Sequence, residues 1–272
     1  MTILFHDRDL CVAVKPVGLD SERDLPAAII SRLGGECYPV HRLDLNVGGL
    51  MVFARTKTAA AALSRLIQTG EMVKEYVARV HGSIEEAGDW TDLLLKDARK
   101  NKVFVVTRER KGVKQARLTF TRLDTDGETS LVRIRLHTGR SHQIRVQFAS
   151  RKHPLLGDHK YGARDGQKAP MLFSCCLTFP WQGRSLRFER LPDWALATPA
   201  QLDRIARMEA AFDRASAAHP PAEADLQALC AYLDSGAWLA DYQADEQGRL
   251  PPDLKRGVLS QDGLYNLLAQ AR

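Results

Sequence analysis

The first 190 residues alternate between short apolar runs and segments in which apolar residues recur every three or four positions. Short runs and period-two alternation predict strands, and the longer spacing predicts helices. The predicted strands are residues 3–5, 10–14, 49–54, 73–80, 116–123 and 131–136. The predicted helices are residues 25–33, 59–68 with Thr56 as N-cap, and 141–151. Hairpin-linked strands are as frequent as helix-separated ones, which predicts an α+β fold with a mixed, mainly antiparallel sheet and flanking helices.

The strand signals stop near Pro192, and the remaining residues have a helical pattern. Apolar residues step by three and four over 202–212 and again over 226–233, followed by a connection that carries Trp238 and a last short helix from Gly263. We therefore expect two domains, residues 1–197 and a small all-α domain over residues 198–272.

The charge differs between these two parts. The 272 residues carry 39 Lys+Arg and 33 Asp+Glu, a net charge of +6, and 44% are hydrophobic, which excludes a disordered or collagen-like chain. Residues 199–272 hold 7 Lys+Arg and 11 Asp+Glu, a net of −4, which leaves +10 for the rest. A basic domain of this kind favours a polyanionic partner such as nucleic acid.

Neither export nor membrane insertion is indicated. The first ten residues are too charged for a signal peptide, and no run approaches the roughly 20 apolar residues of a membrane span. The five cysteines have no C-x-x-C spacing and include an adjacent pair, which predicts reduced thiols and a cytoplasmic protein with no membrane association.

Three segments concentrate polar residues in apolar surroundings: 41–44, 74–76 and 138–145. Asp44 precedes a glycine-bearing turn and a buried strand, which predicts a carboxylate at a strand edge that faces a cleft. The residues alone leave open a local Arg42–Asp44 ion pair or a simple turn hydrogen bond. A metal site is not expected, because the candidate ligands lack ligand-like spacing: His41, His142, His153, Asp158 and His159.

Five segments occur in a family-specific order: HRLDLNVGG, LMVFA, KEYVARVHG, TGRSHQIR and HPLLGDHKYG. Together they resemble the catalytic domain of the RluA family of RNA pseudouridine synthases. The resemblance implies isomerisation of a specific uridine in rRNA or tRNA, without a metal or cofactor, after the base is flipped from its stack. It assigns Asp44 as the catalytic carboxylate, Tyr76 as a base-stacking proton relay and Arg145 as the ionic partner of Asp44. From the residues alone, Tyr76 could be a core tyrosine and Arg145 a solvated helix residue.

RNA contacts are expected from the cations near these motifs. The resemblance gives Arg42 a role in opening the RNA or filling the space of the flipped base, although a structural ion pair remains an alternative. Lys15, Lys74 and Arg140 are further candidates for phosphate contacts. The wider set consists of Arg108, Arg110, Lys111, Lys114, Arg151, Lys152 and Lys160.

The sequence departs from the family pattern at three positions. Val47 and Gly48 replace a usual Thr-Ser pair, and Gln147 replaces a usual histidine.

Two other functions are compatible with parts of the sequence. A glycoside hydrolase is disfavoured because it needs two carboxylates across the glycosidic bond. The open alternative is a non-catalytic RNA-binding or RNA-remodelling protein on the same fold. The acidic C-terminal segment resembles a small helical domain of unknown function. Its charge argues against RNA binding, and we expect it to dock a protein partner or to stabilise the chain.

Overall fold

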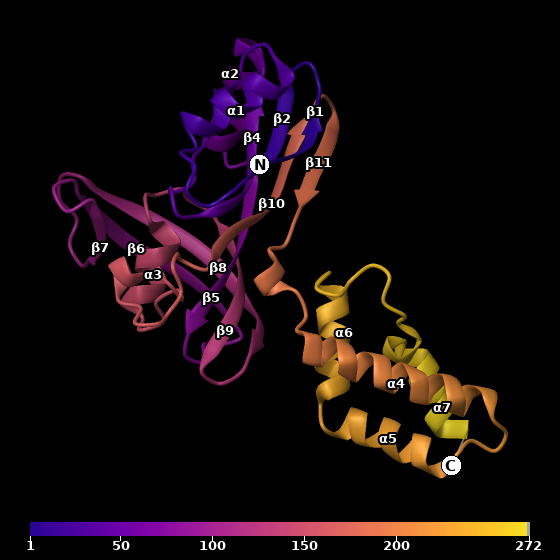
Figure 1. Ribbon diagram of the computed structural model, residues 1–272. Coiled ribbons are helices and arrows are strands. Elements are labelled where there is room, and N and C mark those ends of the chain that lie inside the picture. The colour runs from indigo at the N-terminus through magenta and orange to yellow at the C-terminus, as the bar shows by residue number, and fades with distance from the viewer. Residues whose placement is uncertain (271–272) are drawn as a thin grey trace. The chain divides into compact units, whose positions relative to one another are not determined.

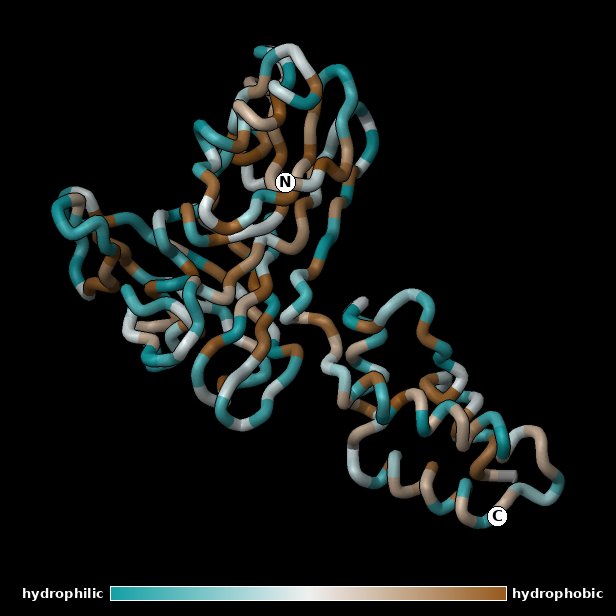
Figure 2. Tube along the Cα trace, in the orientation of Figure 1, coloured by the Kyte–Doolittle hydropathy of each residue, from teal (hydrophilic) through white to brown (hydrophobic). Residues whose placement is uncertain are grey.

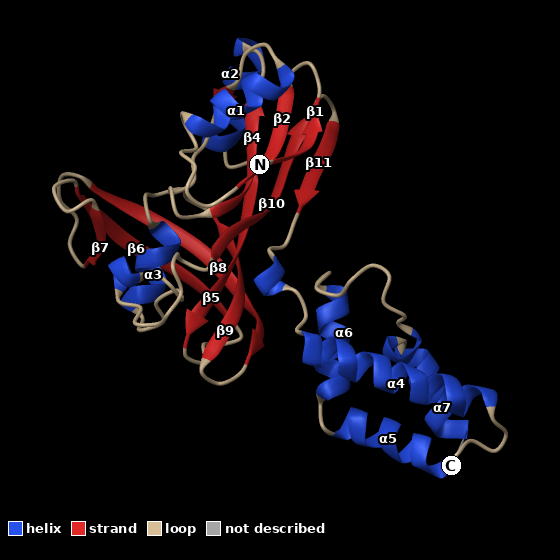
Figure 3. Ribbon diagram, viewed as in Figure 1, coloured by secondary structure: helices blue, strands red, loops and turns tan. Residues whose placement is uncertain are grey.

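The computed structural model describes residues 1–270 and divides into two compact units, Met1–Pro192 and Asp193–Arg272 (Figure 1). The division falls at Pro192, ahead of the residue 197 expected from composition. Figure 3 shows strands throughout the first unit and helices in the second.

The first unit contains the sheet and three α-helices. The elements are β1 Thr2–His6, β2 Leu10–Lys15, α1 Asp24–Leu33, β3 Tyr38–Pro39, β4 Gly48–Ala54, α2 Lys57–Gln68, β5 Val73–His81, β6 Ala87–Asp97, β7 Lys102–Val106, β8 Val113–Thr125, β9 Thr129–Leu136, α3 Gln143–Ser150, a 3-10 turn His159–Tyr161, β10 Leu172–Trp181 and β11 Arg184–Glu189. The described residues form one 11-stranded sheet in the order β1-β2-β4-β10-β5-β9-β8-β6-β7, with β11 beside β10 and β3 beside β4. The β4–β10 pair is parallel and the other pairs are antiparallel. The predicted mixed, mainly antiparallel α+β fold is therefore confirmed.

Strands β2 and β4 are apolar on both faces because a helix covers each face. Leu25 and Ile29 of α1 pack with alternate residues of the two strands, such as Ala13 and Met51. Leu63 of α2 packs with the intervening ones, among them Val12, Leu50 and Val52. Figure 2 shows hydrophobic residues along these central strands. The continuous apolar run of residues 49–54, which predicted a buried strand, is therefore explained by the helices that cover both faces of β4.

The face that carries α1 also carries α3, and one continuous core joins them. It combines Met51 and Phe53 of β4 with Leu118, Ile134 and Phe148 of β8, β9 and α3. Residues 40–46 of the loop before β4, residues 137–142 of the loop before α3, and Arg145 of α3 line the cavity described below.

The local signals at the helix ends act as expected. The Thr56 hydroxyl accepts the Ala59 backbone N–H at 3.1 Å and caps α2.

Gly49 of β4 adopts φ +126°, and a side chain there would collide with the backbone of Ser174 on β10. A glycine is required at this point because β4 approaches β10 closely.

The second unit is a helical module with its own core. It comprises α4 Pro199–Ala217, α5 Glu223–Asp234, α6 Ala237–Glu246 and α7 Gln261–Gln270, with 3-10 turns Asp193–Ala195 and Gly257–Leu259. The expectation of an irregular connection around Trp238 was wrong, because this residue lies in α6 and its indole N–H donates to the Val258 carbonyl at 2.9 Å. Buried Asp241 accepts hydrogen bonds from Gln201, Arg204 and Tyr232. None of the helices in the described residues has the length and apolar character needed to cross a bilayer.

Candidate active site

A cavity of about 1120 Å³ brings the three polar segments of the sequence together. Asp44 reaches it from the loop before β4, Tyr76 from β5 and Arg145 from the first turn of α3. These residues lie up to 101 positions apart in the chain. The structure therefore joins all three predicted catalytic residues in one cavity.

Arg145 is held between two carboxylates. Its Nε and Nη2 donate to Asp158 Oδ2 and Oδ1 at 2.7 and 2.8 Å, and its Nη1 donates to Asp44 Oδ2 at 2.8 Å. Burial opposes the guanidinium charge, but the hydrogen bonds that Arg145 donates to Asp158 and Asp44 outweigh burial and raise the pKa of Arg145. The bidentate Asp158 contact fixes the orientation in which Arg145 meets Asp44.

Asp44 is the exposed end of this ion-pair chain. Its side chain is 26% exposed, whereas the Asp158 side chain is 1% exposed. Both close basic neighbours, Arg145 Nη1 and His142 Nε2, are at Oδ2, at 2.8 and 3.7 Å. No hydrogen bond from the described residues reaches Oδ1, so this oxygen is free for a substrate. The local Arg42–Asp44 pair left open by the sequence is not formed.

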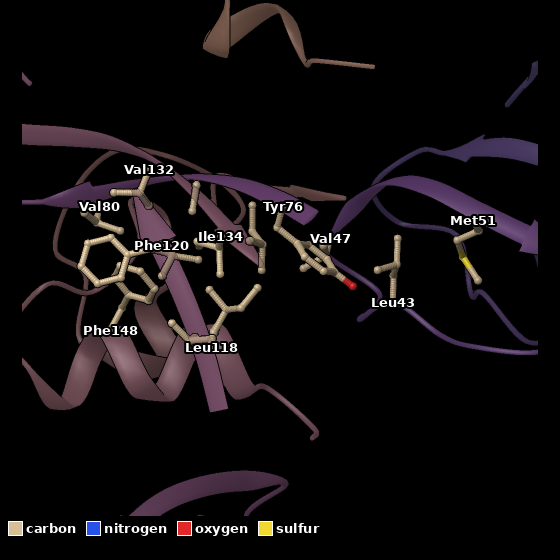
Figure 4. Close-up of a cluster of buried hydrophobic side chains, with 14 of the residues drawn as sticks. Leu43, Val47, Met51, Tyr76, Val80, Leu118, Phe120, Val132, Ile134 and Phe148 are labelled. Atoms are coloured by element: carbon tan, nitrogen blue, oxygen red, sulfur yellow. The ribbon is translucent and has the colours of Figure 1, made fainter. Parts of the chain in front are cut away.

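Tyr76 lies where the apolar core meets the cavity. It is 7% exposed and belongs to the core that includes Leu43, Val47 and Ile134. Figure 4 shows its hydroxyl directed away from Phe120 and Phe148, at the border of that core. Burial, and then the nearby Asp44 carboxylate, raise the pKa of the Tyr76 phenol, which keeps it protonated at neutral pH.

Three residues of the site received no role from the sequence. Asp158 was considered for a metal site, yet it pairs with Arg145. Tyr161 places its hydroxyl 2.8 Å from His142 Nδ1 and its ring 5.1 Å from the Arg145 guanidinium carbon. The motifs TGRSHQIR and HPLLGDHKYG contain all three, but only their meeting in space reveals these contacts.

The cavity wall is strongly basic. Lys74 faces it with no ion-pair partner among the described residues, and burial lowers the pKa of its ammonium. Arg140 lines the cavity and donates from Nε to the Gln115 carbonyl at 3.0 Å. Arg42 is exposed at the cavity and pairs with Glu22 at 2.6 Å. The other cations of the wall are Lys96, Arg135, Lys160 and Lys168.

Two expected RNA contacts are corrected by the structure. Lys15 is fully buried, and its ammonium donates to the carbonyls of Pro16, Leu45 and Val47 at 3.1, 3.1 and 2.8 Å. Arg151 pairs with Asp92 at 2.8 Å and covers the ring of Trp90. Both cations are occupied by the protein itself, so they are not available to phosphate.

The residues at the three departures from the family pattern have structural roles apart from the predicted catalytic residues. Val47 is 2% exposed and packs in the core, and Gly48 begins β4. Gln147 is fully buried and its amide donates to Asp92 at 2.7 Å, on the side of α3 that meets β6.

The candidate metal ligands, four histidines and Asp158, each make a hydrogen bond to another protein group. Among the described residues no group of three or more His, Cys, Asp or Glu is arranged to hold a metal ion. His41 accepts the Val52 N–H, and Asp158 binds Arg145, so each is engaged by protein groups.

Comparisons with known proteins agree with this site. Residues 10–150 match the RNA pseudouridylate synthase family, and residues 200–272 match a domain of unknown function, DUF4298. The dual-specificity RNA pseudouridine synthase RluA of Escherichia coli strain K12 is 32% identical over 211 residues, which are 71% of this chain and 94% of that protein. The mitochondrial tRNA pseudouridine(32) synthase of Saccharomyces cerevisiae is 33% identical over 168 residues, 58% of this chain.

The chain spans only part of some relatives. It covers 36% of the yeast protein and 60% of an uncharacterised RNA pseudouridine synthase of Aquifex aeolicus, which is 33% identical. The solved structure of human RNA pseudouridylate synthase domain containing 4 is similar with a TM-score of 0.61 and 25% identity, over 71% of this chain and 89% of that one. Fold, site and sequence agree: the chain belongs to the RNA pseudouridylate synthase family.

Proposed function

We propose that this protein isomerises a specific uridine in rRNA or tRNA to pseudouridine, with Asp44 as the catalytic carboxylate. The observation that carries the proposal is the Asp44–Arg145–Asp158 chain of ion pairs, which ends in a free carboxylate oxygen inside a basic cavity. Asp44 Oδ1 either attacks the anomeric carbon of the ribose or removes the proton from the neighbouring carbon. Arg145 offsets the charge at Oδ2 in both cases.

Tyr76 supplies the contact to the base. Its ring borders the cavity, where it stacks on the flipped uracil. Burial keeps its phenol protonated at neutral pH, so it acts as a relay after the base rejoins the sugar: its oxygen accepts the proton that carbon 5 loses as its own proton is passed on. No net oxidation or hydrolysis occurs, because the carbon–nitrogen bond broken is replaced by a carbon–carbon bond and one proton is exchanged.

The basic wall suits an RNA whose target nucleotide leaves its stack. Unstacking costs a few kcal/mol, which phosphate contacts must offset. Lys74, Arg42 and Arg140 lie within the cavity that would receive the nucleotide and its flanking phosphates. The reduced cysteines fit a cytoplasmic location for such an enzyme.

Mapping of pseudouridine in total RNA tests the proposal. A strain that lacks this protein should lose one or more sites, the full chain should restore them, and Asp44→Ala should not. Asp89→Asn, which removes an exposed carboxylate that pairs with Arg117 and does not line the cavity, is the matched control and should restore the sites. Persistence of every site in the deletion strain would contradict the synthase function, and restoration by Asp44→Ala would remove Asp44 from the reaction.

The second candidate function is RNA binding without catalysis, which the basic wall alone would favour. The two are separated by Asp44→Ala expressed in the deletion strain: if this variant rescues a growth or ribosome-assembly phenotype without restoring pseudouridine, binding or remodelling is the function that matters to the cell.

The acidic unit Asp193–Arg272 is proposed to bind a protein partner rather than RNA. Its net charge of −4 over residues 199–272 would repel phosphate. Removal of residues 193–272 should leave RNA affinity intact or improved in a filter-binding assay. A large loss of affinity would contradict this assignment.

A further inference from the structure

His142 lies beside the Oδ2 oxygen of Asp44, and Tyr161 contacts both His142 and Arg145. His142 immediately precedes α3 and adopts a left-handed backbone conformation with φ 51°. A non-glycine residue in this region is uncommon and indicates that the surroundings hold it there. The result is an imidazole whose Nε2 is 3.7 Å from Asp44 Oδ2.

The hydrogen bonds of Tyr161 determine which ring nitrogen of His142 carries the proton. The Tyr161 oxygen accepts the Val103 backbone N–H at 2.9 Å, and an amide N–H can only donate. The hydroxyl hydrogen of Tyr161 is then left for His142 Nδ1 at 2.8 Å, the acceptor within its reach among the described residues. Nδ1 is thus an acceptor, and in a neutral imidazole the proton lies on Nε2.

Burial, rather than the neighbouring charges, favours this neutral form. His142 faces Asp44 and Asp158, which are acidic, and Arg145 and Lys160, which are basic. Burial is the largest influence and lowers the pKa of His142 below its usual value, while burial raises that of the Tyr161 phenol. At neutral pH a protonated phenol therefore donates to a neutral imidazole.

We propose that Tyr161 and His142 act as a positioning pair that presents an imidazole N–H to Asp44 Oδ2 and so leaves Oδ1 as the reacting oxygen. This inference rests on the proposed function. At 3.7 Å the N–H and the carboxylate are beyond hydrogen-bond distance, and they close when the substrate enters, as catalytic contacts often do. Arg145 and His142 then both bind Oδ2. The ring of Tyr161 lies against Arg145 as well, so one side chain orients both donors.

The first test reads the proton directly and needs no substrate. Long-range ¹H–¹⁵N spectra of the full chain at pH 7.5 should show His142 protonated at Nε2 and not at Nδ1, the signal being assigned by its absence in His142→Gln. Tyr161→Phe removes the hydroxyl but keeps the ring, and it should convert the single tautomer into a mixture. Tyr265→Phe, at a 51% exposed tyrosine of α7, is the matched control and should change nothing. A proton on Nδ1, or on both nitrogens, in the wild type would overturn the proposal.

The second test uses two substitutions of similar size that place an amide differently. The side-chain nitrogen of glutamine can occupy the position of Nε2, whereas that of asparagine corresponds to Nδ1. In single-turnover reactions with total RNA from the deletion strain, His142→Asn should lower the rate constant about tenfold or more, because a hydrogen bond to a charged group is lost. His142→Gln should retain most of the rate, and the enzyme concentration for half-saturation should change in neither.

The outcomes separate the two proposals. Equal rates for His142→Asn and His142→Gln, in a wild type that is active, would show that the N–H has no positioning role. A thermal melt identifies a purely structural effect, which would lower the stability and the rate of both variants alike. A wild type that forms no pseudouridine in any RNA, yet has the expected tautomer, would contradict the synthase function and leave the Tyr161–His142 hydrogen bond intact.

Discussion

The buried pair Arg145–Asp158 provides a quantitative test, because the same geometry recurs on the surface. In both Arg145–Asp158 and Arg117–Asp89 the arginine Nε and Nη2 donate to the two carboxylate oxygens, at 2.7–2.8 Å and 2.7–3.0 Å. The side chains are 9% and 1% exposed in the first pair and 50% and 51% in the second. Burial is therefore the main difference between them.

Asp158→Asn should destabilise the protein strongly, whereas Asp89→Asn should have no measurable effect. Removing one partner of a buried pair leaves an uncompensated charge and costs about 3–5 kcal/mol. Asp44 still contacts Arg145, so we expect the lower end, about 3 kcal/mol. For a unit of this size, about 2–4 °C per kcal/mol predicts a melting temperature lower by roughly 6–12 °C. Exposed pairs are screened by water and contribute little.

Differential scanning calorimetry of the full chain at neutral pH measures both variants under the same conditions. Equal melting temperatures for Asp158→Asn and Asp89→Asn would refute the reasoning, because burial would then not distinguish the pairs. Pseudouridine formation by Asp158→Asn should also fall, since the asparagine amide no longer holds Arg145 against Asp44. If Asp158→Asn does not fold, urea unfolding of Asp158→Glu, which retains the charge but moves it, should show an intermediate loss of stability.

Three further measurements follow from single contacts. Burial lowers the pKa of His41 from 6.5 to about 3, so between these pH values the unfolded chain binds more protons than the folded one. The free energy of unfolding should therefore fall as the pH drops from 6.5 to about 3, by at most about 1.4 kcal/mol per pH unit. Urea unfolding of His41→Gln should show a weaker dependence of this free energy on pH. Lys15→Met should lower the melting temperature, because three carbonyls lose their donor, but leave the salt dependence of RNA binding unchanged; a slope reduced by about 1 would instead make Lys15 a phosphate contact. Glu22→Gln removes the ion-pair partner of Arg42 and should leave this guanidinium available to phosphate. RNA binding at low salt should therefore tighten by up to about fivefold in a filter-binding assay. Weaker binding would contradict a role for Arg42 as an RNA contact.

The elements that the sequence predicted well are those with a clear burial pattern. Strand β4 is buried at every position, and α2 has a capping residue and a defined apolar face, so local signals and final packing agree. Strand β6 was missed because only one of its 11 residues is fully buried, so it lacks a hydrophobic alternation. Helix α6 was missed because its short apolar pattern follows Gly236 in a left-handed conformation, which resembles a connection.

The sequence identified the residues proposed to react but not the groups that hold them in position. Family resemblance identified Asp44 and Arg145 as candidates. Asp158 orients Arg145 because the chain after α3 turns back and places the Asp158 carboxylate against Nε and Nη2 of this arginine. Such a contact has no signature in spacing. The same holds for Tyr161, whose hydroxyl meets a backbone N–H of β7 and a ring nitrogen near α3.

Charge counting illustrates the same limit, because a sequence records the sign of a side chain but not its surroundings. Lys15 and Lys74 contribute equally to the excess of +10 in residues 1–198, yet three carbonyls enclose the first and the second faces the cavity without an ion-pair partner among the described residues. Arg151 is likewise neutralised by Asp92. The excess charge therefore supports an anionic partner for the domain as a whole. Which cations contact that partner depends on which side chains the fold leaves exposed to the cavity.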